Sequence, residues 1–183
     1  MANVLTVCTG NICRSPAAEA LLRHHLGDLA EVSSAGTYAM TDTGIPAQML
    51  MGLDASGIDA RSHRSRQLTG PMAREADLII AMTAEHRTRI VQEAPAVLRR
   101  TFLLDELAKA ARAQAPLEGA TAAERLSNVP DAIQGFRPEL VGLGVEDVPD
   151  PYGRSQESYD RAYSMIEAAV RDISAWVRGE PVT

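Results

Sequence analysis

Cys8 and Arg14 lie near the start of the chain, separated by five residues within the stretch CTGNICRSP. An apolar run precedes this stretch and an amphipathic helical pattern follows it, which predicts a turn between a first strand and a first helix. Such a turn directs backbone N–H groups and the positive end of a helix dipole at one small volume, an anion site. A sulfur at its floor is stabilised as the nucleophilic thiolate. The planar guanidinium of Arg14 can bind two oxygens of a phosphoryl group at once.

The residue types inside this turn favour a loop that curls around an anion. Gly10 permits a close approach of the backbone to a ligand, and Asn11 tolerates the left-handed conformation that an inward-curling loop requires. Ser15 is predicted to be the N-cap of the following helix, with Pro16 at the first helical position. The alternative for Cys8 is that of most lone cysteines, a small buried apolar residue.

The rest of the chain alternates between strand and helix patterns. Strands are predicted at residues 3–7, around residue 32, and at 78–82 and 101–104. Helices are predicted at residues 16–26, 46–53, 83–93 and 105–113, with a last helix capped by Ser155 and ended by Gly179. The alternation predicts an α/β fold of three layers, in which helices flank a four-stranded parallel sheet with right-handed crossovers. Ligands of such sheets bind outside the carboxyl ends of the strands, where the turn that carries Cys8 is placed.

The composition excludes several classes of protein. At 183 residues the chain is expected to be one domain, residues 1–183, and its formal charge of −6 argues against a nucleic-acid-binding protein. No apolar stretch approaches the ~20 residues of a membrane span, and the N-terminus lacks the pattern of an export signal. Both cysteines lie in one loop, which rules out a disulfide framework or a cysteine-based zinc site and favours a reducing cytoplasm.

Together with three further motifs, the loop resembles that of the low-molecular-weight protein tyrosine phosphatases of the bacterial type. The motifs are SAGT at residues 34–37, SHRSRQL at 62–68 and DPYG at 150–153. They occur in the family's order and cover the chain except for a segment at about 114–144, where the family is usually shorter. The resemblance implies the family's α/β fold, with a phosphate-binding loop after strand 1. It also implies hydrolysis of phosphotyrosine through a phosphocysteine intermediate, without a metal or a cofactor.

The resemblance also implies which residues carry the reaction. Cys8 would attack phosphorus, Arg14 would bind the phosphoryl oxygens, and Asp150 would act first as general acid and then as general base. The other residues of the phosphate-binding loop would be Thr9, Gly10, Asn11, Ile12, Cys13 and Ser15. The Ser15 hydroxyl would donate a hydrogen bond to the sulfur. The partner would be a phosphotyrosine-containing protein, and inorganic phosphate or a similar oxyanion would occupy the loop.

Two residues outside the loop match family residues that support it. Ser34 corresponds to a serine whose hydroxyl braces the loop asparagine, here Asn11. His63 corresponds to a histidine that joins the asparagine and the serines in a hydrogen-bond network under the loop, and a role as general base is the alternative. His86, on the helix predicted at 83–93, has no partner in the sequence pattern and is expected to be exposed.

The walls of the cleft set the expected substrate. Tyr152 is expected to form one wall and Met40 or Tyr38 the other, and the tryptophan that family members usually carry near Met40 is absent. A subgroup of the family hydrolyses phosphoarginine and typically has threonine at the position of Ile12, whose branched side chain favours phosphotyrosine. The DPYG loop resembles that of bacterial members, including this subgroup, so a protein arginine phosphatase is the alternative. An arsenate reductase of the same fold would need further cysteines after Cys13, and the sequence has none.

A segment and a second thiol complete the list of candidate features. The segment from Gln114 to Gly144 is rich in Ala, Gly and Pro and is expected to be either a mobile lid or partly helical, with helical signals at 121–126. Cys13 lies five positions after Cys8 in the same loop and could form a reversible disulfide with it, which would make Cys8 a redox-sensitive cysteine. A buried thiol that only packs is the alternative for Cys13.

Overall fold

A computed structural model describes residues 1–182 of the chain. At its centre is a four-stranded sheet in which all neighbouring strands are parallel, in the order β2-β1-β3-β4. The strands are β1 (Ala2–Cys8), β2 (Ala30–Gly36), β3 (Leu78–Ala81) and β4 (Thr101–Leu103). The register pairs Cys8 with Gly36, so Cys8 lies at the carboxyl edge of the sheet, at the end of a central strand. This arrangement confirms the predicted α/β fold with a four-stranded parallel sheet.

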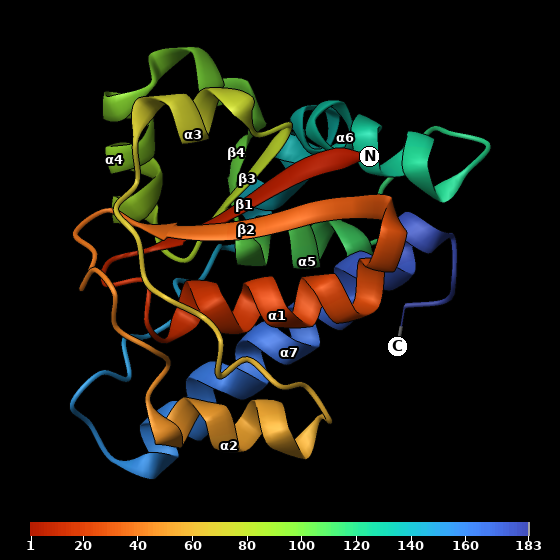
Figure 1. Cartoon of the computed structure of the whole chain (residues 1–183). Helices are drawn as coiled ribbons and strands as arrows, with labels where there is room; N and C mark the ends of the chain where they lie inside the picture. Colours follow the sequence, from red (N-terminus) through yellow and green to blue (C-terminus); the bar gives the residue numbers. More distant parts are fainter. Residues whose placement is uncertain (183) are drawn as a thin grey trace.

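Helices cover both faces of the sheet. They are α1 (Arg14–Leu26), α2 (Ala47–Ala55), α3 (Gly70–Glu75), α4 (Ala84–Glu93), α5 (Leu104–Arg112), α6 (Ala122–Leu143) and α7 (Gln156–Arg178). Two short 3-10 helices, η1 (Gly27–Leu29) and η2 (Pro95–Arg100), precede β2 and β4. As Figure 1 shows, α1, α5 and α7 lie on one face of the sheet with α2 outside them, and α3 and α4 lie on the other face. The three predicted layers are therefore present.

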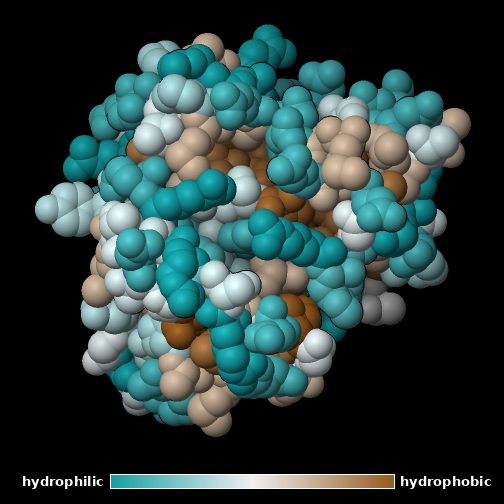
Figure 2. All heavy atoms as spheres, viewed as in Figure 1, coloured by the Kyte–Doolittle hydropathy of each residue, from teal (hydrophilic) through white to brown (hydrophobic). Residues whose placement is uncertain are grey.

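The two faces of the sheet carry separate apolar cores, because successive side chains of a strand point to opposite faces. On β1, Val4 belongs to the core shared with α1, α5 and α7, whereas Leu5 and Val7 belong to the core shared with α3 and α4. Figure 2 shows that hydrophilic residues cover most of the visible surface, with the most hydrophobic residues in gaps between them. Within residues 1–182, no helix is long and apolar enough to cross a membrane.

The segment from 114 to 144, for which the sequence left two possibilities, is mostly helical. α6 begins with a capping box, in which the Thr121 hydroxyl accepts from the Glu124 N–H and the Glu124 carboxylate accepts from the Thr121 N–H. It continues for 22 residues through Pro130 and Pro138, well beyond the predicted helical signals. Its buried residues recur at helical spacing, and they are Leu126, Val129, Ile133 and Leu140. Burial of this face against α5 and α7 therefore stabilises a helix that two prolines weaken.

Candidate active site

The loop that joins β1 to α1, residues 9–13, has the backbone geometry of an anion site. Asn11 has a φ of +55°, a left-handed conformation. The backbone carbonyls of Cys8, Thr9 and Gly10 accept hydrogen bonds of 2.9–3.0 Å from N–H groups of the segment that follows β2, which anchors the outside of the loop. Within residues 1–182, by contrast, the N–H groups of residues 9–13 have no acceptor. A run of unpaired amides before a helix N-terminus is suited to bind an anion.

Cys8 and Ser15 meet inside this loop. α1 begins at Arg14 with Cys13 in the N-cap position, so Ser15 lies in the first turn and the prediction that it caps the helix is wrong. The Ser15 hydroxyl has a different partner, because its Oγ lies 3.0 Å from Cys8 Sγ. Both residues are buried, with Cys8 2% exposed. The sulfur is therefore held at the base of the loop beside a hydroxyl group.

Asn11 supports the loop from below and is itself fully buried. Its Nδ2 donates to Ser15 Oγ at 3.0 Å and to Ser34 Oγ at 2.8 Å. Its Oδ1 accepts from the backbone N–H of Arg66 at 2.9 Å. Its backbone carbonyl oxygen lies 2.8 Å from His63 Nε2. The structure thus brings together around Asn11 the two serines and the histidine that the sequence singled out.

The direction of these hydrogen bonds follows from the one group that can only donate. The backbone N–H of Arg66 must donate to an oxygen, which fixes the orientation of the Asn11 amide. The Asn11 nitrogen then donates to Ser15 Oγ, so that the Ser15 hydrogen remains for another acceptor. Cys8 Sγ lies 3.0 Å from Ser15 Oγ, nearer than the alternative acceptor, the Ala35 carbonyl at 3.5 Å. The network therefore directs a donated hydrogen bond toward the sulfur.

Glu19 ends the network on the side away from the sulfur. It is 9% exposed, accepts a hydrogen bond from Ser34 Oγ and pairs with Arg23 at 2.6 Å. His63 Nδ1 lies 3.8 Å from Glu19 Oε2. The sequence gives one signal for this residue, because its position four residues after Ser15 places both on one face of α1. An acidic residue on a buried helix face needs such partners.

His86 is buried, with 3% of its surface exposed, so the prediction of an exposed residue is wrong. Its Nε2 lies 2.8 Å from Thr9 Oγ1, and its Nδ1 lies 2.9 Å from Thr83 Oγ1. Burial, and then the nearby Arg14 guanidinium, lower the pKa of His86 to about 4, so the ring is neutral near pH 7. One signal in the sequence could have indicated this burial. Thr83 was predicted to cap α4, and the structure confirms this N-cap, whose hydroxyl accepts from the backbone N–H of the residue three positions later, His86.

Arg14 and Asp150 come together from opposite ends of the chain. Arg14 is 4% exposed, and its Nη1 donates to the Val148 carbonyl at 3.0 Å. Its Nη2 lies 3.3 Å from Asp150 Oδ2, and the Asp150 side chain is 52% exposed. The Asp150 loop is tied to the sheet and to α4, because the Val148 N–H donates to Met82 and Asp147 Oδ1 accepts from the Ala84 N–H. This anchoring fixes the guanidinium and the carboxylate beside the loop.

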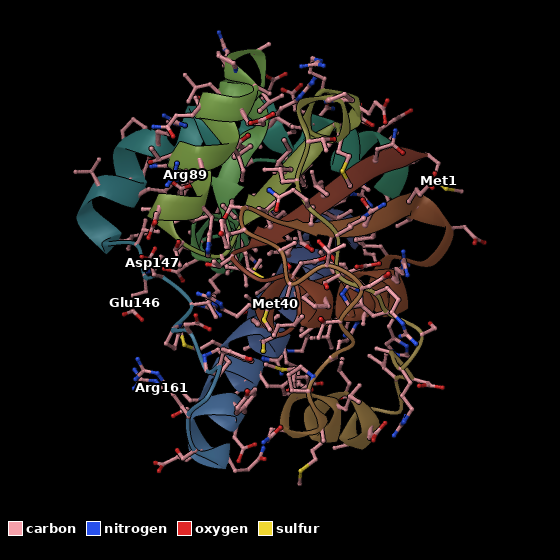
Figure 3. All side chains as sticks on the ribbon, turned by 60° about the vertical axis from the view of Figure 1, so that its left-hand side comes forward. Met1, Met40, Arg89, Glu146, Asp147 and Arg161 are labelled. Carbon is pink, nitrogen blue, oxygen red and sulfur yellow. The ribbon has the colours of Figure 1, made fainter. Side chains whose placement is uncertain are left out.

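A cavity of about 220 Å³ opens above the sulfur. Its lining residues are Cys8, Thr9, Gly10, Ile12, Cys13, Arg14, Tyr38, Met40, Asp150 and Tyr152. Figure 3 turns the carboxyl edge of the sheet forward, with Met40 near the centre, Arg89 of α4 above it and Asp147 to one side. The three side chains that were expected to form the walls, Tyr38, Met40 and Tyr152, are exposed and line this cavity.

Cys13 is buried in the same loop as Cys8. Both are free thiols in the structure. Burial, and then the neighbouring Cys8, raise the pKa of Cys13 to about 12. The Cys13 thiol is therefore protonated near neutral pH, and only the deprotonated form of a thiol is a good nucleophile.

Comparison with known proteins relates this chain to one family. The model of the low molecular weight phosphotyrosine protein phosphatases matches residues 3–134. The low molecular weight protein-tyrosine-phosphatase Etp of Escherichia coli K12 is 31% identical over 170 residues, which is 93% of this chain and 90% of that protein. Vibrio vulnificus Wzb, solved with benzylphosphonate, superposes with a TM-score of 0.69 at 27% identity over 96% of this chain and 97% of that one. The YwlE arginine phosphatase of Geobacillus stearothermophilus superposes with a TM-score of 0.71 at 29% identity, over 95% and 91%.

Proposed function

Because this chain belongs to the low molecular weight phosphotyrosine protein phosphatases, a family of cysteine-dependent enzymes, we propose that Cys8, Arg14 and Asp150 carry out its reaction. One observation supports this assignment above the others. A single cavity of about 220 Å³ contains the Cys8 sulfur at its base, the Arg14 guanidinium beside it and the Asp150 carboxylate at its rim. These are the nucleophile, the binder of phosphoryl oxygens and the proton donor that hydrolysis of a phosphate ester by a thiolate requires.

In the first step the Cys8 thiolate attacks phosphorus and the bond to the leaving oxygen breaks. The N–H groups of residues 9–13 and the Arg14 guanidinium stabilise the charge on the three equatorial oxygens. Asp150 donates its proton to the leaving oxygen. The 3.3 Å pair of Arg14 with Asp150 gives substrate binding a second effect. A phosphoryl group competes for the same guanidinium, so its binding releases the Asp150 carboxyl group to face the leaving group.

In the second step water attacks the phosphocysteine, and the Asp150 carboxylate accepts a proton from that water. The sulfur leaves as a thiolate and inorganic phosphate is released. The hydroxyl of Ser15, 3.0 Å from the sulfur, stabilises the departing thiolate by donating a hydrogen bond. Asn11, Ser34 and His63 act by holding the loop and the Ser15 hydroxyl in place. Neither step needs a metal, because the amides and Arg14 already supply the positive charge.

The proposed substrate is a phosphotyrosine-containing protein. Ile12, Tyr38, Met40 and Tyr152 surround the cavity with side chains that suit an aromatic ring. Etp and the Wzb protein of Escherichia coli K12 are both named low molecular weight protein-tyrosine-phosphatases, which agrees with this choice. The likeness to YwlE, named an arginine phosphatase, keeps phosphoarginine as the second candidate. Two free thiols in one loop support a location in the reducing cytoplasm.

The test compares wild type with Cys8→Ser, Cys13→Ser and Arg14→Lys on an aryl phosphate in excess EDTA. We expect full turnover by wild type, none by Cys8→Ser, and most of it by Cys13→Ser, the same substitution at the second thiol of the loop. Cys8→Ser is expected to bind inorganic phosphate still. Arg14→Lys is expected to lose about 10²–10³-fold in kcat. Turnover by Cys8→Ser, or loss of wild-type turnover in EDTA, would overturn the assignment. Faster turnover of phosphoarginine than of phosphotyrosine by the wild type would favour the second candidate.

A further inference from the structure

A second hollow adjoins the catalytic cavity along α4. It has a volume of about 530 Å³ and shares Thr9 and Tyr38 with the cavity above Cys8. Four residues of α4 line it, and three of them are charged, Glu85, Arg89 and Glu93. Because the two hollows share a wall, chain that continues from a residue seated in the cavity can enter this groove directly. Figure 3 shows Arg89 on the same forward face of the molecule as Met40.

The charged residues of this groove form no ion pairs within the described part of the chain. Glu85, Arg89 and Glu93 follow one another at intervals of four residues, a spacing at which opposite charges on a helix commonly pair. All three are exposed, and none of them forms an ion pair or a side-chain hydrogen bond within the described part of the chain, residues 1–182. Three unpaired charges of alternating sign therefore face the groove.

The spacing of these charges matches an extended peptide. Four residues of an α-helix advance about 6 Å along its axis. Two residues of an extended chain advance about 6.6 Å, and side chains two positions apart point to the same side. Successive α4 charges therefore lie opposite every second residue of an extended peptide that runs along the helix. Glu85 is the nearest to the catalytic cavity, because the adjacent His86 contacts Thr9 of the loop.

We infer that the groove beside α4 binds the part of the substrate protein that flanks the phosphorylated residue, in extended form, with a basic side chain opposite Glu85 and an acidic one opposite Arg89. The inference rests on the proposed function and adds the sequence context that the enzyme selects. A basic residue two positions beyond the acidic one would meet Glu93. Electrostatic complementarity in an exposed groove gives modest affinity and good discrimination between partners.

The test uses pairs of phosphotyrosine peptides that differ only in order. One peptide of each pair carries Lys-x-Asp beside the phosphotyrosine and the other carries Asp-x-Lys, so that composition and net charge are identical. The pairs place this motif at successive distances from the phosphotyrosine, on its N-terminal or its C-terminal side. An exposed ion pair is worth a factor of about 1.4–5 in affinity. Reversing the order turns two attractions into two repulsions, which amounts to four such factors. We therefore expect kcat/KM to differ at least about fourfold in the preferred register, and the peptide with Lys nearer to the phosphotyrosine to be the better substrate.

The matched variant is the double exchange Glu85→Lys with Arg89→Glu, which leaves the net charge of the protein unchanged. It is expected to reverse the preference while turnover of a small aryl phosphate stays the same. High salt is expected to reduce the wild-type ratio toward one. Equal kcat/KM for both peptides in every register, or a preference that the double exchange or salt leaves unchanged, would overturn the inference. If the wild type does not hydrolyse a small aryl phosphate at all, the result would instead contradict the proposed function.

Discussion

The buried His86 makes the stability of this protein depend on pH in a defined window. Burial lowers the pKa of His86 in the folded protein from 6.5 to about 4, whereas an unfolded chain leaves the imidazole near 6.5. Between these values the unfolded chain binds a proton that the folded protein does not. Stability therefore rises with pH across this window and is lost as the pH falls through it. The window of about 2.5 pH units, at 1.36 kcal/mol per unit, amounts to about 3 kcal/mol.

The assay is urea denaturation of wild type, His86→Gln and His24→Gln at a series of pH values. Glutamine keeps a donor and an acceptor but does not titrate, so the contributions of all other groups cancel in the comparison with wild type. We expect the stability advantage of wild type over His86→Gln to shrink by about 3 kcal/mol as the pH falls from about 6.5 to about 4. His24 is exposed on α1, and its replacement serves as the control for removing a solvent-facing histidine. An advantage that stays constant across the window would refute the lowered pKa of His86 and the burial that causes it.

Three further predictions concern the loop. Iodoacetamide on the native protein near neutral pH should label Cys8 and leave Cys13 unlabelled, because the pKa of Cys13 is raised to about 12; equal labelling would contradict this. Peroxide should oxidise Cys8 to a sulfenic acid, and the disulfide that Cys13 forms by attacking it with loss of water should form faster as the pH rises, because the raised pKa of Cys13 keeps its thiol protonated near neutral pH; an inactive protein that retains a free Cys13 thiol would exclude this protection. Asn11→Ala should lower kcat/KM about 10- to 100-fold, since it leaves buried partners unsatisfied, and Ser34→Ala should cost less because it removes fewer of these bonds; the reverse order would show that Asn11 does not organise the loop.

The fold and the loop could be predicted because both are encoded locally. Apolar runs of four to seven residues between helical patterns indicate parallel strands, and the structure has such strands at β1 and β3. The approach of DPYG to the Cys8 loop follows from the resemblance to the phosphatase family and not from the strand pattern, because these residues lie between two helices, α6 and α7.

The features that were predicted wrongly, or only in part as for α6, depend on tertiary contacts that the sequence does not reveal. Ser15 has the residue type of an N-cap, but its hydroxyl contacts Cys8 and Asn11 instead of a backbone N–H. His86 is buried because Thr9 and Thr83 satisfy both ring nitrogens, and the contact with Thr9 arises only when α4 packs beside the loop. α6 continues through Pro130 and Pro138 because its apolar face is buried. Tertiary packing outweighs local propensity in each case.

Chemical trapping of the intermediate tests the central claim, that the Cys8 sulfur forms a covalent bond to phosphorus. An aryl phosphate with a good leaving group needs little help from a general acid to phosphorylate the enzyme, whereas hydrolysis of the phosphocysteine still needs the Asp150 carboxylate. The variant Asp150→Ala should therefore accumulate the phosphoenzyme. After rapid quenching and proteolysis, we expect mass spectrometry to find one phosphoryl group on the peptide that contains Cys8, attached to that sulfur. A phosphoryl group on another residue, or steady turnover with none bound, would contradict the mechanism.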